Sequence, residues 1–274
     1  MKTFYAKGRK LTLEITEYFK GKVSYSLANK LIRKKDVKVN GVRVKEDLKT
    51  NDGDKIEVYY DGEDMRANTI LFEDENLLVV YKPKGITSEE FYSLIQAKYK
   101  TASFIHRLDR NTDGIMLFGL NKIAEEELLK GFKQRTFDKF YLAEVYGEPK
   151  EKSATLTAYL KKDEKNSLVK IYDKPEKDAE KIVTVYTVLK TNGKTSTLEV
   201  KLVTGKTHQI RAHLAHIGHF IIGDGKYGYE SINRTFHATK QRLTAYKTVL
   251  YFDENSDLYY LNGRQFEIKA KDKP

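Results

Sequence analysis

The stretch FIHRLDRNTDGIMLFGLN holds the side chains of this chain that are best suited to chemistry. Imidazole, guanidinium and carboxylate groups gather within eight residues: His106, Arg107, Asp109, Arg110 and Asp113. A carboxylate flanked by cations can act as a nucleophile or a general base, so Asp109 is the first candidate. Asp109 and Asp113 as a general acid and base pair are an alternative, but no neighbour would keep one carboxyl protonated. A surface turn with solvated charges is the third interpretation.

Arg211 belongs to a second unusual stretch, TGKTHQIRAHLAHIGHFIIGDGKYG. It lies in a predicted helix, at the edge of an apolar face made by Ile210, Leu214 and Ile217. From that edge a long side chain can reach inward while its stem stays packed. A buried guanidinium without a carboxylate would cost roughly several kcal/mol. Asp109 is the natural partner, so the sequence predicts an ion pair between Asp109 and Arg211.

Apolar periodicity predicts the elements that position these residues. Strands are expected at 77–81, 104–105, 115–118, 139–147, 182–189 and 197–203. Helices are expected at 89–99 and 123–134. Asn262-Gly263 predicts a hairpin near the end of the sequence. Many antiparallel strands with a few helices indicate an α+β fold with a mixed, mainly antiparallel sheet.

The first 60 residues form a basic module. They hold 15 Lys or Arg against 8 Asp or Glu, about two thirds of the net charge of +11. After an irregular start we expect helices at 11–19 and 26–35, a hairpin at 37–44 around Asn40-Gly41 and a strand at 55–60. These elements gather a basic patch: Lys30, Arg33, Lys34, Lys35, Lys38 and Arg43. A basic patch on a helix and a hairpin can bind a nucleic-acid phosphate backbone.

The composition excludes several classes of protein. With 274 residues the chain has room for a large and a small domain. It has no cysteine, which excludes disulfides, thiolate metal sites and cysteine nucleophiles. No run approaches the roughly 18 to 20 apolar residues of a membrane span, and the start lacks the apolar core of a signal peptide. A cytoplasmic protein is therefore expected.

Two features of the second stretch suggest sites that we do not predict. Gly205-Lys206-Thr207 resembles part of a phosphate-binding loop, but that motif needs a glycine five residues earlier, where Val200 stands. Four histidines suggest a metal site: His208, His213, His216 and His219. Zinc sites usually combine imidazoles with a carboxylate or thiolate, so hydrogen bonds from these rings to backbone or RNA are favoured. We expect no metal and no cofactor.

The pattern SYSLANKLIRKKDVKVNGVRV, followed by GDKIEV, resembles the small RNA-binding domain of the S-four type. This resemblance implies binding to structured RNA. The polar run DGEDMRAN then indicates a linker. The expected organisation is an RNA-binding domain at 1–62 with its core at 11–60, a linker at 63–68 and a catalytic domain at 69–274.

Four motifs follow one another at compatible spacing. They are His106-Arg107-Leu108-Asp109 with Thr112 and Gly114, then Lys139-Phe140-Tyr141, then Thr204 to Arg211, then Gly223-Asp224 with Lys226-Tyr227-Gly228. In these motifs the sequence from about Ile70 to Phe252 resembles pseudouridine synthases of the RluA/RluD type. The resemblance implies a monomeric, cofactor-free isomerase that converts uridine to pseudouridine in structured RNA. Large-subunit ribosomal RNA is the favoured substrate, and transfer RNA is second.

The resemblance also implies roles for single residues. Asp109 is the expected catalytic aspartate, Tyr141 the active-site tyrosine and Arg211 the arginine that pairs with the aspartate. Contacts to RNA are expected from Arg107, His106, Ile210 and His208. The carboxylate would act on the ribose as a nucleophile or as a proton acceptor, and both remain open. Extruding the target base costs a few kcal/mol, of which stacking on Tyr141 recovers about 1 to 3 kcal/mol.

The sequence departs from the family pattern at a few positions. Asp113 stands where serine is usual, Lys206 where arginine is common, Phe220 where proline is common and Phe236 where leucine is usual. These positions bear on contacts to RNA. Two other functional classes remain as alternatives. A non-catalytic RNA-binding protein or RNA chaperone would use only the basic surface, and a nucleoside hydrolase using two aspartates would release free uracil.

Overall fold

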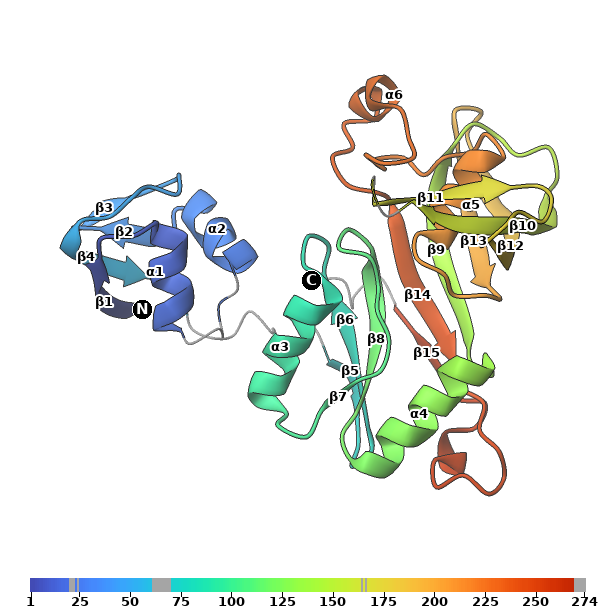
Figure 1. Ribbon diagram of the computed structural model, residues 1–274, viewed down its shortest axis with the longest axis horizontal. Coiled ribbons are helices and arrows are strands. Elements are labelled where there is room, and N and C mark those ends of the chain that lie inside the picture. The colour runs from blue at the N-terminus through green and yellow to red at the C-terminus, as the bar shows by residue number, and fades with distance from the viewer. Residues whose placement is uncertain (20–22, 24, 61–69, 164, 166, 269–274) are drawn as a thin grey trace. The chain divides into compact units, whose positions relative to one another are not determined.

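The computed structural model describes residues 1–274 except 20–22, 24, 61–69, 164, 166 and 269–274 (Figure 1). It divides into two compact units. The first comprises Met1–Thr69 and Ser88–Ala102, and the second comprises Ile70–Thr87 and Ser103–Lys273. The predicted linker at 63–68 lies outside the described residues. The domain boundaries drawn from the sequence stay a prediction.

The first unit combines a four-stranded sheet with helices. Its elements are β1 (Lys2–Lys7), α1 (Leu11–Tyr18), α2 (Tyr25–Arg33), β2 (Val37–Val39), β3 (Val42–Arg43), β4 (Asp52–Val58) and α3 (Ser88–Lys98). The strand order is β1-β4-β2-β3. The two predicted helices and the hairpin at Asn40-Gly41 are confirmed. Both turn residues have positive φ, as the tightest hairpins require.

The predicted irregular start of the first unit is wrong. Residues Lys2–Lys7 form β1, which pairs antiparallel with β4. Phe4 and Ala6 are buried in the core of the unit and alternate with exposed residues. This period of two identifies a strand with one buried face, but only two apolar side chains carry the signal among several lysines.

The second unit is built on one large sheet. Its strands are β5 (Ile70–Glu73), β6 (Leu77–Lys82), β7 (Ser103–Phe104), β8 (Asp113–Gly119), β9 (Asp138–Tyr146), β10 (Ser153–Asp163), β11 (Leu168–Tyr172), β12 (Glu180–Thr191), β13 (Thr195–Leu202), β14 (Leu243–Val249) and β15 (Gln265–Glu267). Its helices are α4 (Lys122–Gln134), α5 (Gln209–His216), α6 (Glu230–Thr235) and the 3-10 helix η2 (Tyr259–Leu261). The main path of the sheet runs β11-β10-β12-β13-β9-β14-β8-β6-β5, with β7 on β8 and β15 on β14.

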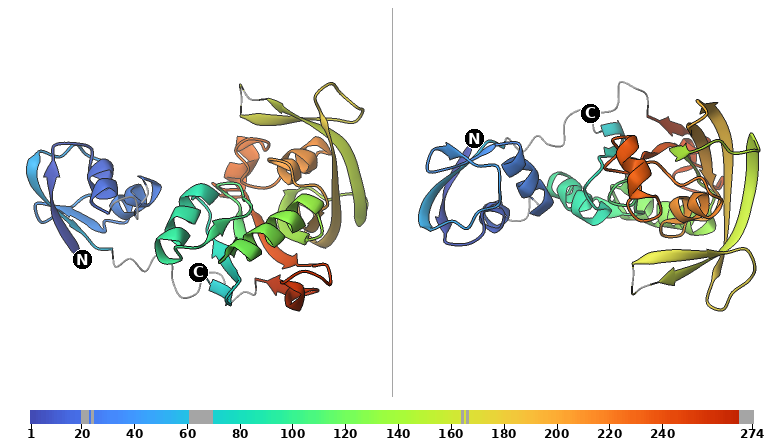
Figure 2. Two further views of the ribbon diagram at one scale, coloured as in Figure 1. Left: turned by 60° about the horizontal axis from the view of Figure 1, so that its bottom comes forward. Right: turned by 90° about the horizontal axis from the view of Figure 1, so that it is seen from above.

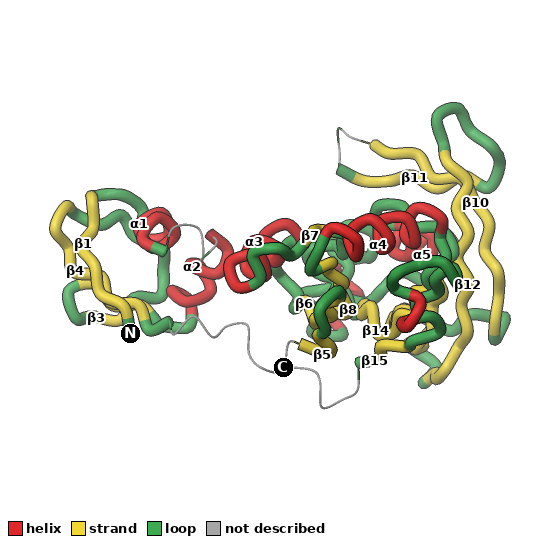
Figure 3. The backbone as a smooth tube through the Cα atoms, turned by 90° about the horizontal axis from the view of Figure 1, so that it is seen from below, coloured by secondary structure: helices red, strands yellow, loops and turns green. Residues whose placement is uncertain are grey.

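The predicted α+β class with a mainly antiparallel sheet is confirmed. Among the described residues, the strand pairs of the large sheet are antiparallel except β8 with β14. Helix α4 packs against β8, and α5 packs against β10, β11 and β12 (Figure 2). The long strands β10 and β12 run side by side at one end of this unit (Figure 3).

Some elements of the second unit differ from the sequence prediction. The sequence does not predict strands β5, β10, β11 and β14 or helix α6. The predicted hairpin at Asn262-Gly263 is wrong, because η2 precedes this turn and β15 pairs with β14. The Gly263 N–H donates to the Leu250 carbonyl at 2.8 Å, and the Leu250 N–H donates to the Arg264 carbonyl at 3.0 Å. Hydrogen bonds to Leu250, which follows β14, thus take the place of a hairpin between two strands on either side of Asn262-Gly263.

The centre of the sheet positions one loop, the connection from β7 to β8. Every residue of β6 and β8 is buried, and β8 begins against β14 with Thr244 beside Asp113. Gly114 has φ 129°, and a Cβ atom there would lie 2.2 Å from the Ala245 carbonyl oxygen. Only glycine allows the two backbones to approach so closely. The end of this loop is therefore fixed in the core.

Within the described part of the chain, no helix combines the length and apolar character needed to cross a membrane.

Candidate active site

Asp109 lies in the loop between β7 and β8, and one hydrogen bond within the loop and two from other segments hold it. The Thr112 N–H donates to the Asp109 carbonyl at 3.0 Å, and the Gly85 N–H donates to the Arg110 carbonyl at 2.8 Å. The buried Gln241 side chain donates to the Thr112 hydroxyl at 2.6 Å. The backbone around Asp109 is therefore fixed, while its side chain remains 22% exposed.

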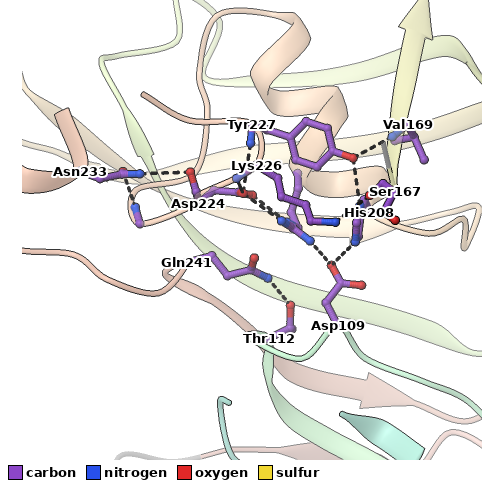
Figure 4. A network of polar contacts seen from close by, with 12 residues as sticks. Asp109, Thr112, Ser167, Val169, His208, Asp224, Lys226, Tyr227, Asn233 and Gln241 are labelled. Atoms are coloured by element: carbon purple, nitrogen blue, oxygen red, sulfur yellow. Dashed lines mark hydrogen bonds and ion pairs between the residues drawn. The ribbon is translucent and has the colours of Figure 1, made fainter. Parts of the chain in front are cut away.

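Arg211 on α5 binds two carboxylates at once, those of Asp109 and Asp224. Figure 4 labels both aspartates. Arg211 Nη1 donates to Asp109 Oδ2 at 2.8 Å. Its Nε and Nη2 donate to Asp224 Oδ2 and Oδ1 at 2.6 and 2.9 Å. Burial alone would lower the pKa of Arg211, but the bonds and charge of Asp224, together with those of Asp109, raise this pKa above its ordinary value. Arg211 is therefore a permanent cation beside Asp109.

Asp224 fixes the orientation of this guanidinium. Its side chain is fully buried, and its Oδ1 also accepts the backbone N–H groups of Lys226 at 2.9 Å and Tyr227 at 3.2 Å. Burial would raise the pKa of Asp224, but the hydrogen bonds and charge of Arg211 hold this pKa below its usual value. Asp224 binds two of the three guanidinium nitrogens, Nε and Nη2. The third nitrogen, Nη1, is therefore directed at Asp109.

Tyr141 contributes a neutral phenol to the same site. It lies on β9, opposite Val200 of β13 and Ala245 of β14, and its ring is almost fully buried. Burial raises the pKa of Tyr141, and the negative charge of Asp109 raises it further. The hydroxyl therefore stays protonated at physiological pH, and the ring offers an apolar face to a ligand.

These side chains open into one cavity of about 260 Å³. It is lined by His106, Arg107, Leu108, Asp109, Thr112, Phe132, Lys139, Tyr141, Leu202, Gly205, Lys206, Thr207, His208, Gln209, Ile210, Arg211 and Leu243. Apolar walls with a few charged groups are typical of sites that orient a small polar ligand. The cations in the lining suit a ligand that carries phosphate.

The cavity unites all the site residues that the sequence predicts in the second unit. Asp109, Tyr141 and Arg211 line it, and so do the four residues expected to contact RNA: Arg107, His106, Ile210 and His208. The distance from Arg211 to Asp109 is that of the predicted ion pair. The roles of these residues stay predictions.

His106 has a structural environment as well as its place in the lining. Its Nε2 accepts the Leu117 N–H at 3.0 Å, and its ring stacks on Phe132 with centroids 4.4 Å apart. Burial, together with the nearby charge of Lys139, lowers the pKa of His106 to about 3. The ring is therefore neutral at physiological pH, and its Nε2 is occupied by the backbone.

The basic patch on the first unit is described by its own contacts. Its members are Lys30, Arg33, Lys34, Lys35, Lys38 and Arg43. Lys38 Nζ lies 5.3 Å and the Arg43 guanidinium carbon 5.0 Å from the centre of the Tyr59 ring. Arg43 also donates to the carbonyl of Lys35. The segment after α2 and the hairpin are thus joined at Lys35 and Arg43.

The carboxylate of Asp113 contacts Tyr81, Thr244 and Lys84. Its Oδ2 accepts the Tyr81 hydroxyl at 2.5 Å, and its Oδ1 accepts the Thr244 hydroxyl at 2.7 Å. Lys84 Nζ lies 3.5 Å from the same Oδ1. Asp113 therefore joins β6, β8 and β14 through these contacts.

The remaining histidines of the second stretch bond within the protein. His213 contacts the Thr184 hydroxyl at 3.0 Å, His216 contacts Asp173 at 2.7 Å, and His219 contacts the Tyr146 carbonyl at 3.0 Å. Among the residues that the structure describes, no three His, Cys, Asp or Glu side chains are grouped so that they could hold a metal ion.

Three site residues had no role assigned from the sequence. Asp224 and Tyr227 were recognised only as parts of a motif, and so was Lys139. Burial, with repulsion from Arg135, lowers the pKa of Lys139. A signal for Asp224 was available, because a guanidinium has donors for two carboxylates and only Asp109 had been assigned. Tyr227 gave no such signal, since its contacts come from other segments.

Comparison with known proteins agrees with this geometry. Residues 76–216, more than half of the chain, match the family described as RNA pseudouridylate synthase. "Ribosomal large subunit pseudouridine synthase C" of Vibrio parahaemolyticus is 28% identical, over 89% of this chain and 84% of that protein. An "Uncharacterized RNA pseudouridine synthase" of Helicobacter pylori is 38% identical, over 65% of this chain and 72% of its own length.

A solved structure shares the fold. "Human RNA Pseudouridylate Synthase Domain Containing 1" superposes with a TM-score of 0.59 at 25% identity, covering 66% of this chain and 77% of the human one. The match in sequence spans the Asp109 loop, β9 and α5. The chain therefore belongs to the RNA pseudouridylate synthase family, and it is an RluA-type enzyme that isomerises uridine in RNA to pseudouridine.

Proposed function

We propose that this enzyme modifies uridine in large-subunit ribosomal RNA, with Asp109 as the group that acts on the ribose. The observation that carries the assignment of Asp109 is its ion pair with Arg211 inside the cavity. The relative from Vibrio parahaemolyticus, named for the large ribosomal subunit, aligns with nearly all of this chain, which favours ribosomal RNA over transfer RNA.

The reaction suits groups of this kind. The bond between the ribose and the ring nitrogen of uracil breaks, the base turns, and a carbon–carbon bond forms in its place, with no net oxidation or reduction. Asp109 would act on the sugar as nucleophile or base. The Tyr141 ring would support the extruded base by stacking, which contributes about 1 to 3 kcal/mol per base. Arg107 would contact a phosphate or occupy the space that the base leaves.

The first unit would hold the RNA that surrounds the target. We expect its basic patch to bind RNA and to take no part in the reaction. Lys38, Arg43 and Tyr59 form a cationic and aromatic surface there. Phosphate contacts of this kind position a nucleic acid without reading its sequence. We propose that this unit adds affinity for structured RNA, as its S-four-like sequence implies.

The substrate can be found by mapping pseudouridines in total RNA from source cells with and without the gene. We expect at least one pseudouridine of large-subunit ribosomal RNA to disappear on deletion and to return with a plasmid copy. A copy carrying Asp109→Asn should not restore it. If pseudouridines disappeared from transfer RNA alone, transfer RNA would be the substrate in place of ribosomal RNA. An unchanged map would contradict both substrates.

A further inference from the structure

His208 is held in an unusual conformation beside Asp109. It immediately precedes α5 and has φ 55°, in the left-handed region that residues with a side chain seldom adopt. Its side chain makes no capping bond to the helix and lines the cavity instead. The Nε2 atom lies 4.0 Å from Asp109 Oδ2, the oxygen that also accepts Arg211. Strained backbone at such a place points to a function.

A chain of hydrogen bonds indicates which nitrogen of His208 carries the proton (Figure 4). The backbone N–H of Val169 can only donate, and it donates to the Tyr227 hydroxyl oxygen at 2.9 Å. That hydroxyl also lies 2.9 Å from His208 Nδ1, which can accept its proton. We therefore assign Nδ1 as the acceptor in the neutral ring and Nε2 as the nitrogen whose proton faces Asp109.

Burial of His208 favours this neutral ring. Burial lowers the pKa of His208, Asp109 and Asp224 oppose the shift, and Arg211 and Lys226 add to it. The ring is therefore neutral at physiological pH. A neutral donor can hold a carboxylate oxygen without adding a second full positive charge beside Arg211. A second full charge would make the carboxylate a weaker base and a weaker nucleophile.

We infer that His208 is a positioning residue, which Tyr227 holds in its Nε2–H form so that Asp109 Oδ2 is bound and Oδ1 faces the substrate. The inference rests on the proposed role of Asp109. In the free enzyme the distance of 4.0 Å exceeds a hydrogen bond. Such contacts often shorten when the substrate fills a site. Oδ2 then has two donors, and Oδ1 is the oxygen left to face the ribose.

The protonation state can be observed without RNA. Nitrogen-15 NMR of the full chain with labelled histidine distinguishes Nδ1–H, Nε2–H and doubly protonated rings, and loss of a signal in His208→Gln assigns His208. We expect protonated Nε2 and unprotonated Nδ1 at neutral pH, and a mixture of tautomers in Tyr227→Phe. A proton on Nδ1, or a doubly protonated ring at pH 7, would overturn the inference whatever the enzyme's activity.

Kinetics test the consequence for the reaction. The substrate is total RNA from source cells that lack the gene, and the readout is the single-turnover rate of pseudouridine formation with enzyme in excess. His208→Gln keeps an N–H near the position of Nε2 and should stay within about threefold of wild type. His208→Leu loses that donor and should slow the reaction roughly 10- to 100-fold, as expected for one missing bond to a charged group. Equal rates for the two variants would contradict the inference.

A double-mutant comparison separates tautomer control from packing. Tyr227→Phe alone should lower the rate of the reaction severalfold. It should also make this rate fall more as the pH is lowered, because Nδ1 loses the partner that fixes it. In the His208→Gln background the same change should have no effect, because glutamine has no tautomer to fix. An equal loss in both backgrounds would show that Tyr227 acts only through packing and would overturn its assigned role. If Asp109→Asn were active, the role of Asp109 would fail while the NMR result could still stand.

Discussion

Arg211 joins the loop that carries Asp109 to the rest of the site. Three of its donors meet three carboxylate oxygens on two aspartates. Lysine has one nitrogen at the end of a flexible stem and cannot reproduce this fork. Asp224 is fully buried, so a change at Arg211 affects both the reactive carboxylate and a charge that water cannot reach.

Arg211→Lys is expected to lower the single-turnover rate at least about 100-fold, because Asp109 loses its fixed donor. It should also lower the free energy of unfolding by about 3 kcal/mol, since Asp224 keeps an incompletely paired buried charge. Chemical denaturation and the rate assay measure the two effects. Arg242→Lys is the matched control. Arg242 binds both oxygens of Glu144 at 2.9 Å in a partly exposed pair, which should cost less than about 1 kcal/mol. If Arg211→Lys and Arg242→Lys lowered the free energy of unfolding equally, this account would be contradicted.

The ion pair between Asp109 and Arg211 could be predicted from the sequence because an inward arginine needs a carboxylate. The role of Asp224 could not be predicted with the same ease. It stands between Gly223 and Gly225, and an aspartate between glycines has the appearance of a turn residue. His208 was expected only to contact RNA. Its tautomer depends on Tyr227 and Val169, which other segments bring to it.

Among the elements, the turn before α6 holds Asp224 in place. Gly223 has φ 81°, and a Cβ there would lie 2.2 Å from the Lys240 carbonyl oxygen. Its N–H donates to the Asn233 side chain at 2.7 Å, and that side chain donates to the Asp224 carbonyl at 3.1 Å. Gly225 on the other side of Asp224 has open space at its Cβ position.

Gly223→Ala should therefore displace Asp224 and, through Arg211, the carboxylate of Asp109. We expect the free energy of unfolding to fall by about 3 kcal/mol or more, from strain and overlap with Lys240. The reaction rate should fall with it under conditions where the variant is still folded. Gly225→Ala should leave stability and rate close to wild type. If both alanines were tolerated, the turn would not be the device that orients Arg211.

Elements with strong local patterns were the predictable ones. The apolar run in β6, the helical spacing in α4 and the alternation in β9 each identify their element within a few residues. Pairing between distant segments was not predictable. Thr244 lies beside Asp113, 131 residues earlier in the sequence, and this pairing joins β14 to β8 at the end of the loop that carries Asp109. No local period encodes a contact of that range.

At the scale of the whole molecule, the basic charge of the first unit should determine the affinity for RNA. It should have no effect on the rate of the chemical step. Lys38→Gln with Arg43→Gln removes two members of the basic patch. The slope of log affinity against log salt should fall by up to about 2, roughly one for each phosphate that the protein no longer neutralises. The single-turnover rate at saturating enzyme should stay unchanged. Lys190→Gln with Lys194→Gln removes the same charge from exposed positions of the second unit. An equal effect from this control pair would show that the patch has no special part in binding.

Buried histidines predict how stability depends on pH. Burial, with the nearby His216, lowers the pKa of His213 from 6.5 to about 4. Between these values the unfolded chain binds a proton that the folded protein does not, so stability falls as pH falls from 6.5 towards 4. His213→Asn, which can still contact Thr184, should reduce the slope of unfolding free energy by up to about 1.4 kcal/mol per pH unit in this window. Chemical denaturation of the wild type and of His213→Asn from pH 7 to pH 4 measures this slope. If the two plots of unfolding free energy against pH were parallel, His213 would not be the source of the pH dependence.

The most direct test of the account is the activity of Asp109→Asn. This change keeps the size of the side chain and removes its charge. We expect pseudouridine formation in RNA from cells that lack the gene to fall below detection under single-turnover conditions, while affinity for that RNA stays within about threefold of wild type. Mass spectrometry of the digested RNA measures the first quantity and filter binding the second. Full activity of the variant would contradict the account, because the cavity would then carry out the reaction without the carboxylate that Arg211 holds in place.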